Sequence, residues 1–149
     1  MSLADRDYLQ INQAIFSLAN AYRSRRDREG REALLGLTLP EQAVLMVLGQ
    51  LAPIDSRQLS RAMGINPGTI SVRVQSLVEK GLVTKDQDGE DRRRWRLQLT
   101  AEGARSHQKT VDGAIAYTRE FLSALDETEQ KAFHGLLVKA SHSLGFDWQ

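Results

Sequence analysis

The segment SRQLSRAMGINPGTISVRVQSLVEK, residues 56–80, decides the fold. Gly64 is a typical helix stop, because glycine adopts the left-handed backbone conformation that ends many helices. Asn66 followed by Pro67 is a typical helix start, because asparagine caps free backbone N–H groups and proline fits the first helical turn. The segment therefore predicts a short helix before the glycine, a tight turn, and a second helix that runs to about Lys80.

The second predicted helix has two different faces. Ile70, Val74 and Leu77 recur at helical spacing and predict the buried face, whereas the remaining positions are mostly small or polar. Small and polar side chains in the first half of the second helix are typical of helices that contact DNA bases in a major groove. We expect hydroxyl, amide and guanidinium groups to bond base edges or phosphates, and Val72 to lie against a thymine methyl. The predicted contacts are Asn66, which also caps the helix, Gly68, Thr69, Ser71, Val72, Arg73, Gln75 and Ser76. An ordinary surface helix is the alternative.

A β-hairpin is predicted directly after this helix. Residues 82–85 and 95–99 have strand patterns, and the acidic, glycine-containing residues between them suit a turn. Arg92, Arg93 and Arg94 form a basic cluster at the tip and returning arm, where we expect contact with a DNA minor groove. A solvated charge run balanced by neighbouring acids is the alternative. Trp95 is expected to anchor the core beneath the hairpin.

The N-terminal part predicts one long amphipathic helix followed by an apolar one. Tyr8, Ile11, Ile15, Leu18 and Tyr22 recur at steps of three and four, which predicts a narrow apolar stripe typical of a helix–helix contact. The charged stretch that follows contains a glycine at position 30, which we expect to end or loosen the helix. A second helix follows, through residue 51.

The C-terminal part predicts two further helices. Thr100 is a candidate N-cap for the first, whose mostly apolar face includes Phe121 and Leu122. Asp126 and Glu129 have the spacing of a capping box, which predicts the start of the last helix. Its apolar side chains include Phe133 and Leu137.

Composition sets limits on function. The 149 residues carry a net charge of only +1, but residues 55–99 hold nine Lys or Arg against six Asp or Glu, so this segment favours a polyanion. The absence of cysteine excludes disulfides and thiolate metal sites. No motif of a catalytic nucleophile, phosphate loop or metalloprotease is present, and the three histidines lack metal-binding spacing. We therefore expect no enzyme, no metal, no cofactor and no membrane span, and a cytoplasmic protein.

These elements, taken in order, resemble the MarR family of winged helix-turn-helix regulators over nearly the whole chain. The sequence of residues 69–71 and 77–83 is similar to the end of that family's recognition helix and the entry to its wing. Asp91, Arg92 and Arg93 resemble its D-R-R wing, and residues 99–103, LTAEG, its L-T-x-x-G exit. The chain departs from the family at Val72, where a basic or polar residue is common.

The resemblance implies a mostly helical fold with a small β-hairpin wing. It implies a single domain over residues 1–149, with a DNA-binding lobe at 36–100 and dimerisation helices at 1–35 and 101–149. It further implies a homodimer on a pseudo-palindromic operator, acting as a repressor that a small aromatic or anionic effector relieves. The predicted dimer contacts are Tyr8, Ile11, Ile15, Leu18, Phe121, Leu122, Phe133 and Leu137. A winged helix for protein contacts, or a ligand sensor without specific DNA binding, is the alternative.

Overall fold

The computed structural model describes residues 4–33, 36–87 and 95–143. The chain divides into two compact units, Met1–Leu39 and Pro40–Gln149. The first contains helix α1, Asp5–Ala33. We predicted that Gly30 would end or loosen this helix. The prediction of an end is wrong, because the helix continues through Gly30 to Ala33. One interior glycine costs only about 1 kcal/mol relative to alanine, and the surrounding arginine and glutamate residues favour helix.

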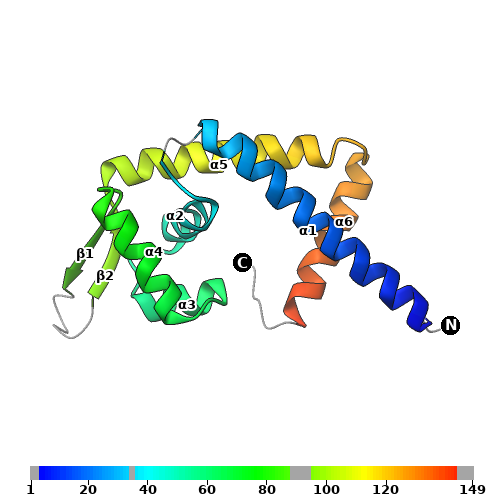
Figure 1. Ribbon diagram of the computed structural model, residues 1–149, viewed down its shortest axis with the longest axis horizontal. Coiled ribbons are helices and arrows are strands. Elements are labelled where there is room, and N and C mark those ends of the chain that lie inside the picture. Colours follow the sequence, from blue (N-terminus) through cyan, green and yellow to red (C-terminus); the bar gives the residue numbers. More distant parts are fainter. Residues whose placement is uncertain (1–3, 34–35, 88–94, 144–149) are drawn as a thin grey trace. The chain divides into compact units, whose positions relative to one another are not determined.

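The second unit contains the helix-turn-helix and the hairpin that the sequence predicts. Figure 1 shows the hairpin and the end of α4 near the start of α5, α3 beside the start of α4, and α6 following the far end of α5. The described elements are α2 (Leu39–Leu51), α3 (Ser56–Met63), α4 (Pro67–Glu79), β1 (Val83–Gln87), β2 (Trp95–Leu99), α5 (Ala101–Phe121) and α6 (Glu127–His142). Mostly helical architecture with one two-stranded antiparallel sheet is thereby confirmed.

Local capping residues fix the turn between α3 and α4. The side chain of Asp55 accepts bonds from the first-turn amides of α3, and Gln58 completes a capping box. Gly64 ends α3 in the left-handed conformation, at φ 62°, and Asn66 starts α4 by accepting a bond from the backbone N–H of Thr69 at 2.9 Å. These caps set the direction in which α4 leaves α3.

The hairpin is tied to the rest of the second unit by one unpredicted bridge. Strands β1 and β2 pair antiparallel, with Val83 opposite Leu99 and Gln87 opposite Trp95. Ile54, in the connection between α2 and α3, pairs with Leu97 of β2, whose N–H donates to the Ile54 carbonyl oxygen at 2.8 Å. The bridge holds the wing beside the helix-turn-helix.

The core lies between α2, α3, α4 and β2, and we call this part of the second unit, residues 40–99, the lobe. Each of these elements contributes at least one large aliphatic side chain with no solvent exposure, which is the burial that stabilises a small domain. They are Val44, Leu45, Leu48, Leu59, Ile70, Leu77 and Leu97. Helix α5 packs closely on α2, since a side chain at Gly49 would overlap the His107 imidazole.

Candidate nucleic-acid interface

Helix α4 presents one face to the core and the opposite face to solvent. Ile70, Val74 and Leu77 are buried, as predicted. Val72 lies on the opposite face with 72% of its surface exposed, beside the exposed Ser71. A centrally placed, exposed and uncharged position on the second helix of a helix-turn-helix is where a side chain can reach base edges.

The start of α4 is also open to solvent. Asn66 and Gly68 are exposed, and Thr69 is half-buried. The Asn66 side-chain oxygen is engaged with the Thr69 amide, so its role in this structure is to cap the helix. Arg73 is half-buried on the flank of the helix.

Two side chains on α4 have fixed orientations. Gln75 is exposed, and its amide Nε2 donates to Glu79 Oε1 at 3.1 Å, one turn further along the helix. Ser76 is half-buried, and its Oγ donates at 2.6 Å to Oε1 of Glu41 on α2. Our prediction that Ser76 points outward with Gln75 is wrong for its hydroxyl, which bonds within the lobe.

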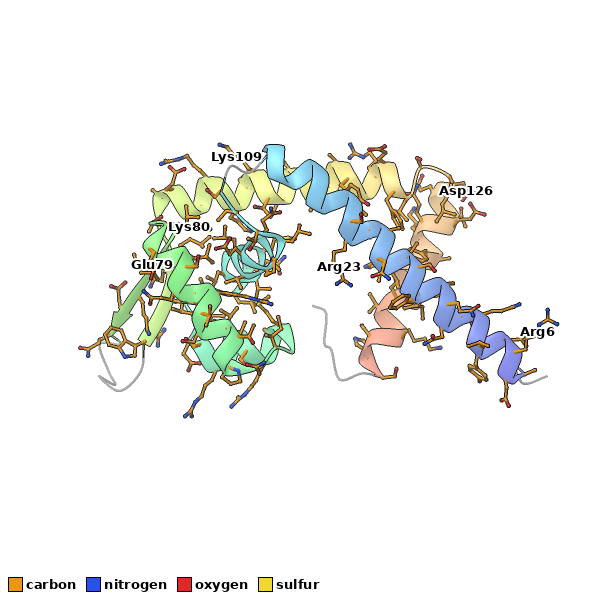
Figure 2. All side chains as sticks on the ribbon, in the orientation of Figure 1. Arg6, Arg23, Glu79, Lys80, Lys109 and Asp126 are labelled. Atoms are coloured by element: carbon orange, nitrogen blue, oxygen red, sulfur yellow. The ribbon has the colours of Figure 1, made fainter. Side chains whose placement is uncertain are left out.

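The Glu41 carboxylate holds the end of α4 against α2. Glu41 is only 5% exposed, and its Oε1 lies 2.6 Å from Nζ of Lys80 as well as from the Ser76 hydroxyl. Lys80 and its neighbour Glu79 lie at the C-terminal end of α4 (Figure 2). A carboxylate this deeply buried needs such donors, because an unpaired buried charge is strongly destabilising. The network restricts how α4 can turn about its own axis.

The base of the wing is locked to the end of α4 by the LTAEG segment. Thr100 Oγ1 donates to the Gly81 carbonyl at 2.7 Å and accepts from the Gly103 amide at 2.9 Å, which caps α5. The backbone N–H of Thr100 donates to the Leu82 carbonyl at 3.0 Å. A Cβ at Gly103 would overlap that same carbonyl oxygen, so the close approach requires glycine. The N-cap predicted at Thr100 is confirmed.

The tip of the wing is described only in part. Arg92, Arg93 and Arg94 lie outside the described residues. Trp95 is on the same side of the hairpin as the buried Leu97, but it lies beyond the core and is 43% exposed, so our prediction of a core anchor is wrong. The ammonium group of Lys85 lies 5.4 Å from the centre of its ring, which suits a cation–π contact.

A second feature of the chain is apolar surface on α1. All four of its predicted dimer contacts are exposed, and Ile15 is 62% exposed. Leu9 and Phe16, which we did not predict, are exposed as well and widen the stripe. Their spacing of seven residues was visible in the sequence and marks the same side of a helix.

Helices α5 and α6 carry further apolar surface. Leu137 is 52% exposed, and Leu136 and Ile115 are exposed too. Phe121, Leu122 and Phe133 are half-buried. The ring of Phe121 stacks on Tyr117 of its own chain, with 6.5 Å between ring centres.

Other kinds of site receive no support from the described residues. Within residues 4–33, 36–87 and 95–143, no three His, Asp or Glu side chains are grouped so that they could hold a metal ion. In the same part of the chain, no helix combines the length and apolar character needed to cross a membrane.

The arrangement of α3, α4 and the β1–β2 hairpin defines a winged helix-turn-helix protein. A model described as MarR family matches residues 35–94, which include α3, α4 and β1 and end just before β2. The transcriptional regulator HosA from Escherichia coli is 28% identical over 128 residues, which are 86% of this chain and 94% of HosA. The chain is therefore similar to regulators of the MarR family.

Solved structures share the fold over most of the chain. Streptococcus pneumoniae FabT in complex with DNA matches with a TM-score of 0.81 and 21% identity, covering 93% of this chain and 97% of FabT. The organohalide-sensing transcriptional regulator RdhR, in its 2,4-dichlorophenol-bound form, matches with a TM-score of 0.77 and 18% identity, covering 95% of this chain and 82% of RdhR. At these identities, the likeness concerns the fold.

Proposed function

We propose that this protein is a homodimeric transcription regulator that binds a pseudo-palindromic DNA operator and catalyses no reaction. The observation that carries the proposal is the two-sided α4, whose buried side is fixed to the lobe core while Ser71, Val72 and Gln75 face solvent. Inserted into a major groove, this outward side would meet base edges. HosA, which this chain resembles in sequence, is a transcriptional regulator. FabT, which shares the fold, was solved in complex with DNA. Both support this function.

Dimerisation follows from the exposed apolar surface of the helices outside the lobe. Ile15 of α1 and Leu137 of α6 are each more than half exposed, and apolar neighbours continue both surfaces. Contiguous apolar surface of this kind marks an association site, and a two-fold axis lets the same surface serve both chains. Two lobes would then meet half-sites about 34 Å apart, one turn of DNA.

The wing supplies the second DNA contact in this proposal. Arg92, Arg93 and Arg94 directly precede β2 in the sequence, and the base of the β1–β2 hairpin is bonded to the end of α4 through Thr100. With α4 in the major groove, the hairpin would reach the flanking minor groove, where arginine is favoured in narrow A·T tracts.

Regulation by a small molecule is the last part of the proposal. RdhR binds a chlorinated phenol, a small aromatic molecule, which supports an aromatic or anionic effector for this chain. An effector with unequal affinity for two lobe spacings would shift the affinity for DNA. We propose a repressor relieved in this way, acting in the cytoplasm, which is the compartment that holds the DNA of bacteria such as those of its relatives.

The salt dependence of DNA binding tests the wing. Affinity for a mixed-sequence duplex, measured by fluorescence anisotropy between 50 and 200 mM salt, should fall with a log–log slope of about −0.9 per phosphate contacted. Arg92→Ala with Arg93→Ala should lower the affinity for every sequence. The matched control removes two exposed charges from α5, by Lys109→Ala with Arg119→Ala, and should change binding little. Salt-independent binding, or equal loss in both double variants, contradicts the proposal.

A further inference from the structure

The outward surface of α4 has an unusual chemical composition for a DNA-contacting helix. Val72, which is 72% exposed, is apolar and cannot form a hydrogen bond. In the major groove, the one apolar group that a base pair presents is the C5-methyl of thymine. An exposed valine at the centre of this surface is therefore complementary to thymine.

The neighbouring Gln75 is held in one orientation. Its Nε2 donates to the Glu79 carboxylate, and because an ionised carboxylate only accepts hydrogen bonds, the amide nitrogen must be the end that faces Glu79. The second N–H of that amide and its Oε1 then remain available to the DNA as one hydrogen-bond donor and one acceptor. Adenine presents the complementary pair in the major groove, an N7 acceptor and an N6 donor.

The two side chains are close enough to act on the same or adjacent base pairs. Positions 72 and 75 are three residues apart, so their Cβ atoms lie about 5–6 Å from each other on a helix surface. Successive base pairs are about 3.4 Å apart. One helix turn thus offers a thymine contact and an adenine contact side by side.

Guanine recognition is poorly supported by the same surface. The commonest specific contact to guanine is a bidentate bond from arginine or lysine. Arg73 is the one basic residue in the sequence of α4, and it is half-buried on the flank, whereas Glu79 adds a negative charge to the outward surface. The flank position suits a phosphate contact for Arg73.

We propose that α4 selects A·T base pairs, with Val72 contacting the thymine methyl and Gln75 bonding adenine N7 and N6. Glu79 is a positioning residue that fixes the Gln75 amide. The proposal rests on the proposed function and adds to it the base pairs that each recognition helix prefers.

Single-atom changes in the DNA test the proposal. The duplex is the inverted repeat enriched from random DNA, and each thymine in turn is replaced by uracil, which lacks only the methyl group. At the contacted thymine, the wild-type affinity should fall about 4-fold, the equivalent of one buried methyl group. At the contacted adenine, replacement by 7-deazaadenine, which lacks the N7 acceptor, should cost about 10-fold.

Matched protein variants assign the two contacts. Val72→Ala should bind the thymine and uracil duplexes equally well, and Gln75→Ala should lose the preference for adenine over 7-deazaadenine. Glu79→Gln should reduce that second preference while leaving the first intact, an outcome that general loss of stability would not give. Gln50→Ala, exposed on α2, is the control and should alter neither ratio.

The outcomes separate this proposal from the proposed function. If no duplex is enriched and none binds, the proposed function fails. If a repeat is bound but uracil at every thymine is neutral and Val72→Ala changes no ratio, the DNA-binding function stands and the base-pair assignment is overturned. If the Gln75→Ala protein instead loses affinity only for duplexes with guanine at the contacted position, the base-pair assignment is also overturned.

Discussion

The lobe buries most of its large aliphatic side chains within one chain, whereas α1 and α6 leave theirs largely exposed. Leu45, Leu48 and Leu59 of the lobe have no exposed surface. In contrast, Ile15 of α1 is 62% exposed, and no described residue of α6 is buried. The difference indicates that the lobe can be stable by itself, while α1 and α6 need a further surface to cover them.

The largest expected effect tests the self-sufficient lobe. Leu45→Ala should lower the free energy of unfolding by about 2–5 kcal/mol, because it removes a fully buried side chain and leaves a cavity. The loss should be the same at low and high protein concentration, as measured by urea denaturation. Leu136→Ala, on exposed surface of α6, is the comparison, and its effect should depend on protein concentration. If both variants lost the same free energy of unfolding at every protein concentration, the distinction between a self-sufficient lobe and partner-dependent helices would be removed.

The next effect tests the exposed helices. Ile15→Glu should weaken the dimer about 100-fold or more, since each dimer contains the substitution twice and each aliphatic side chain contributes about 1.5–3 kcal/mol on burial. Gln13→Glu adds the same charge to an exposed position in the middle of the same helix and should leave the dimer intact. Sedimentation velocity measures both. A monomeric wild type, or a dimer insensitive to Ile15→Glu, would contradict the assignment of this surface.

A smaller effect is expected where the lobe joins α5. Gly103→Ala should destabilise the protein by about 1–3 kcal/mol, because its Cβ would overlap the Leu82 carbonyl oxygen. Gly113→Ala, in the same helix, has nothing within 4 Å of the added Cβ and should stabilise it by about 0.5–1 kcal/mol. Thermal unfolding of the two variants provides the measurement. A Gly103→Ala protein as stable as the wild type would show that residue 103 does not approach the Leu82 carbonyl oxygen tightly.

The smallest effect concerns an exposed ion pair next to that glycine. A hydrogen bond from Arg105 holds the pKa of the Glu102 carboxyl below its ordinary value. Because the pKa is lowered in the folded protein, the stabilising effect is present above the ordinary pKa and is lost as the pH falls through the lowered value. Both side chains are exposed, so solvent screens the pair. The difference in melting temperature between wild type and Glu102→Gln should be small at neutral pH and absent in acid or in 1 M salt. A large, salt-insensitive difference would contradict this reasoning.

Local signals in the sequence predicted the elements of the lobe well. The helix start at Asn66, the N-cap at Thr100, and the capping box at Asp126 are confirmed, because each depends on residues within one helical turn. The continuation of α1 through Gly30 was not predicted, because a single glycine costs the helix less than the favourable residues around it contribute.

Contacts between distant segments could not be predicted in the same way. The bond from Ser76 to Glu41 joins residues 35 positions apart, and no pattern within α4 distinguishes Ser76 from its outward neighbours. The exposed position of Trp95 depends on where the core ends, which is set by how the hairpin packs. The outward side of α4 was predicted, because helical periodicity alone determines which residues face away from Ile70 and Leu77.

Selection of bound sequences from random duplex DNA, at about 150 mM salt, tests the central claim most directly. The account predicts an enriched inverted repeat whose half-sites are about one helical turn apart, as two α4 helices in one dimer require. A single half-site without symmetry, or no enrichment together with salt-independent binding, would contradict a dimeric, sequence-specific regulator.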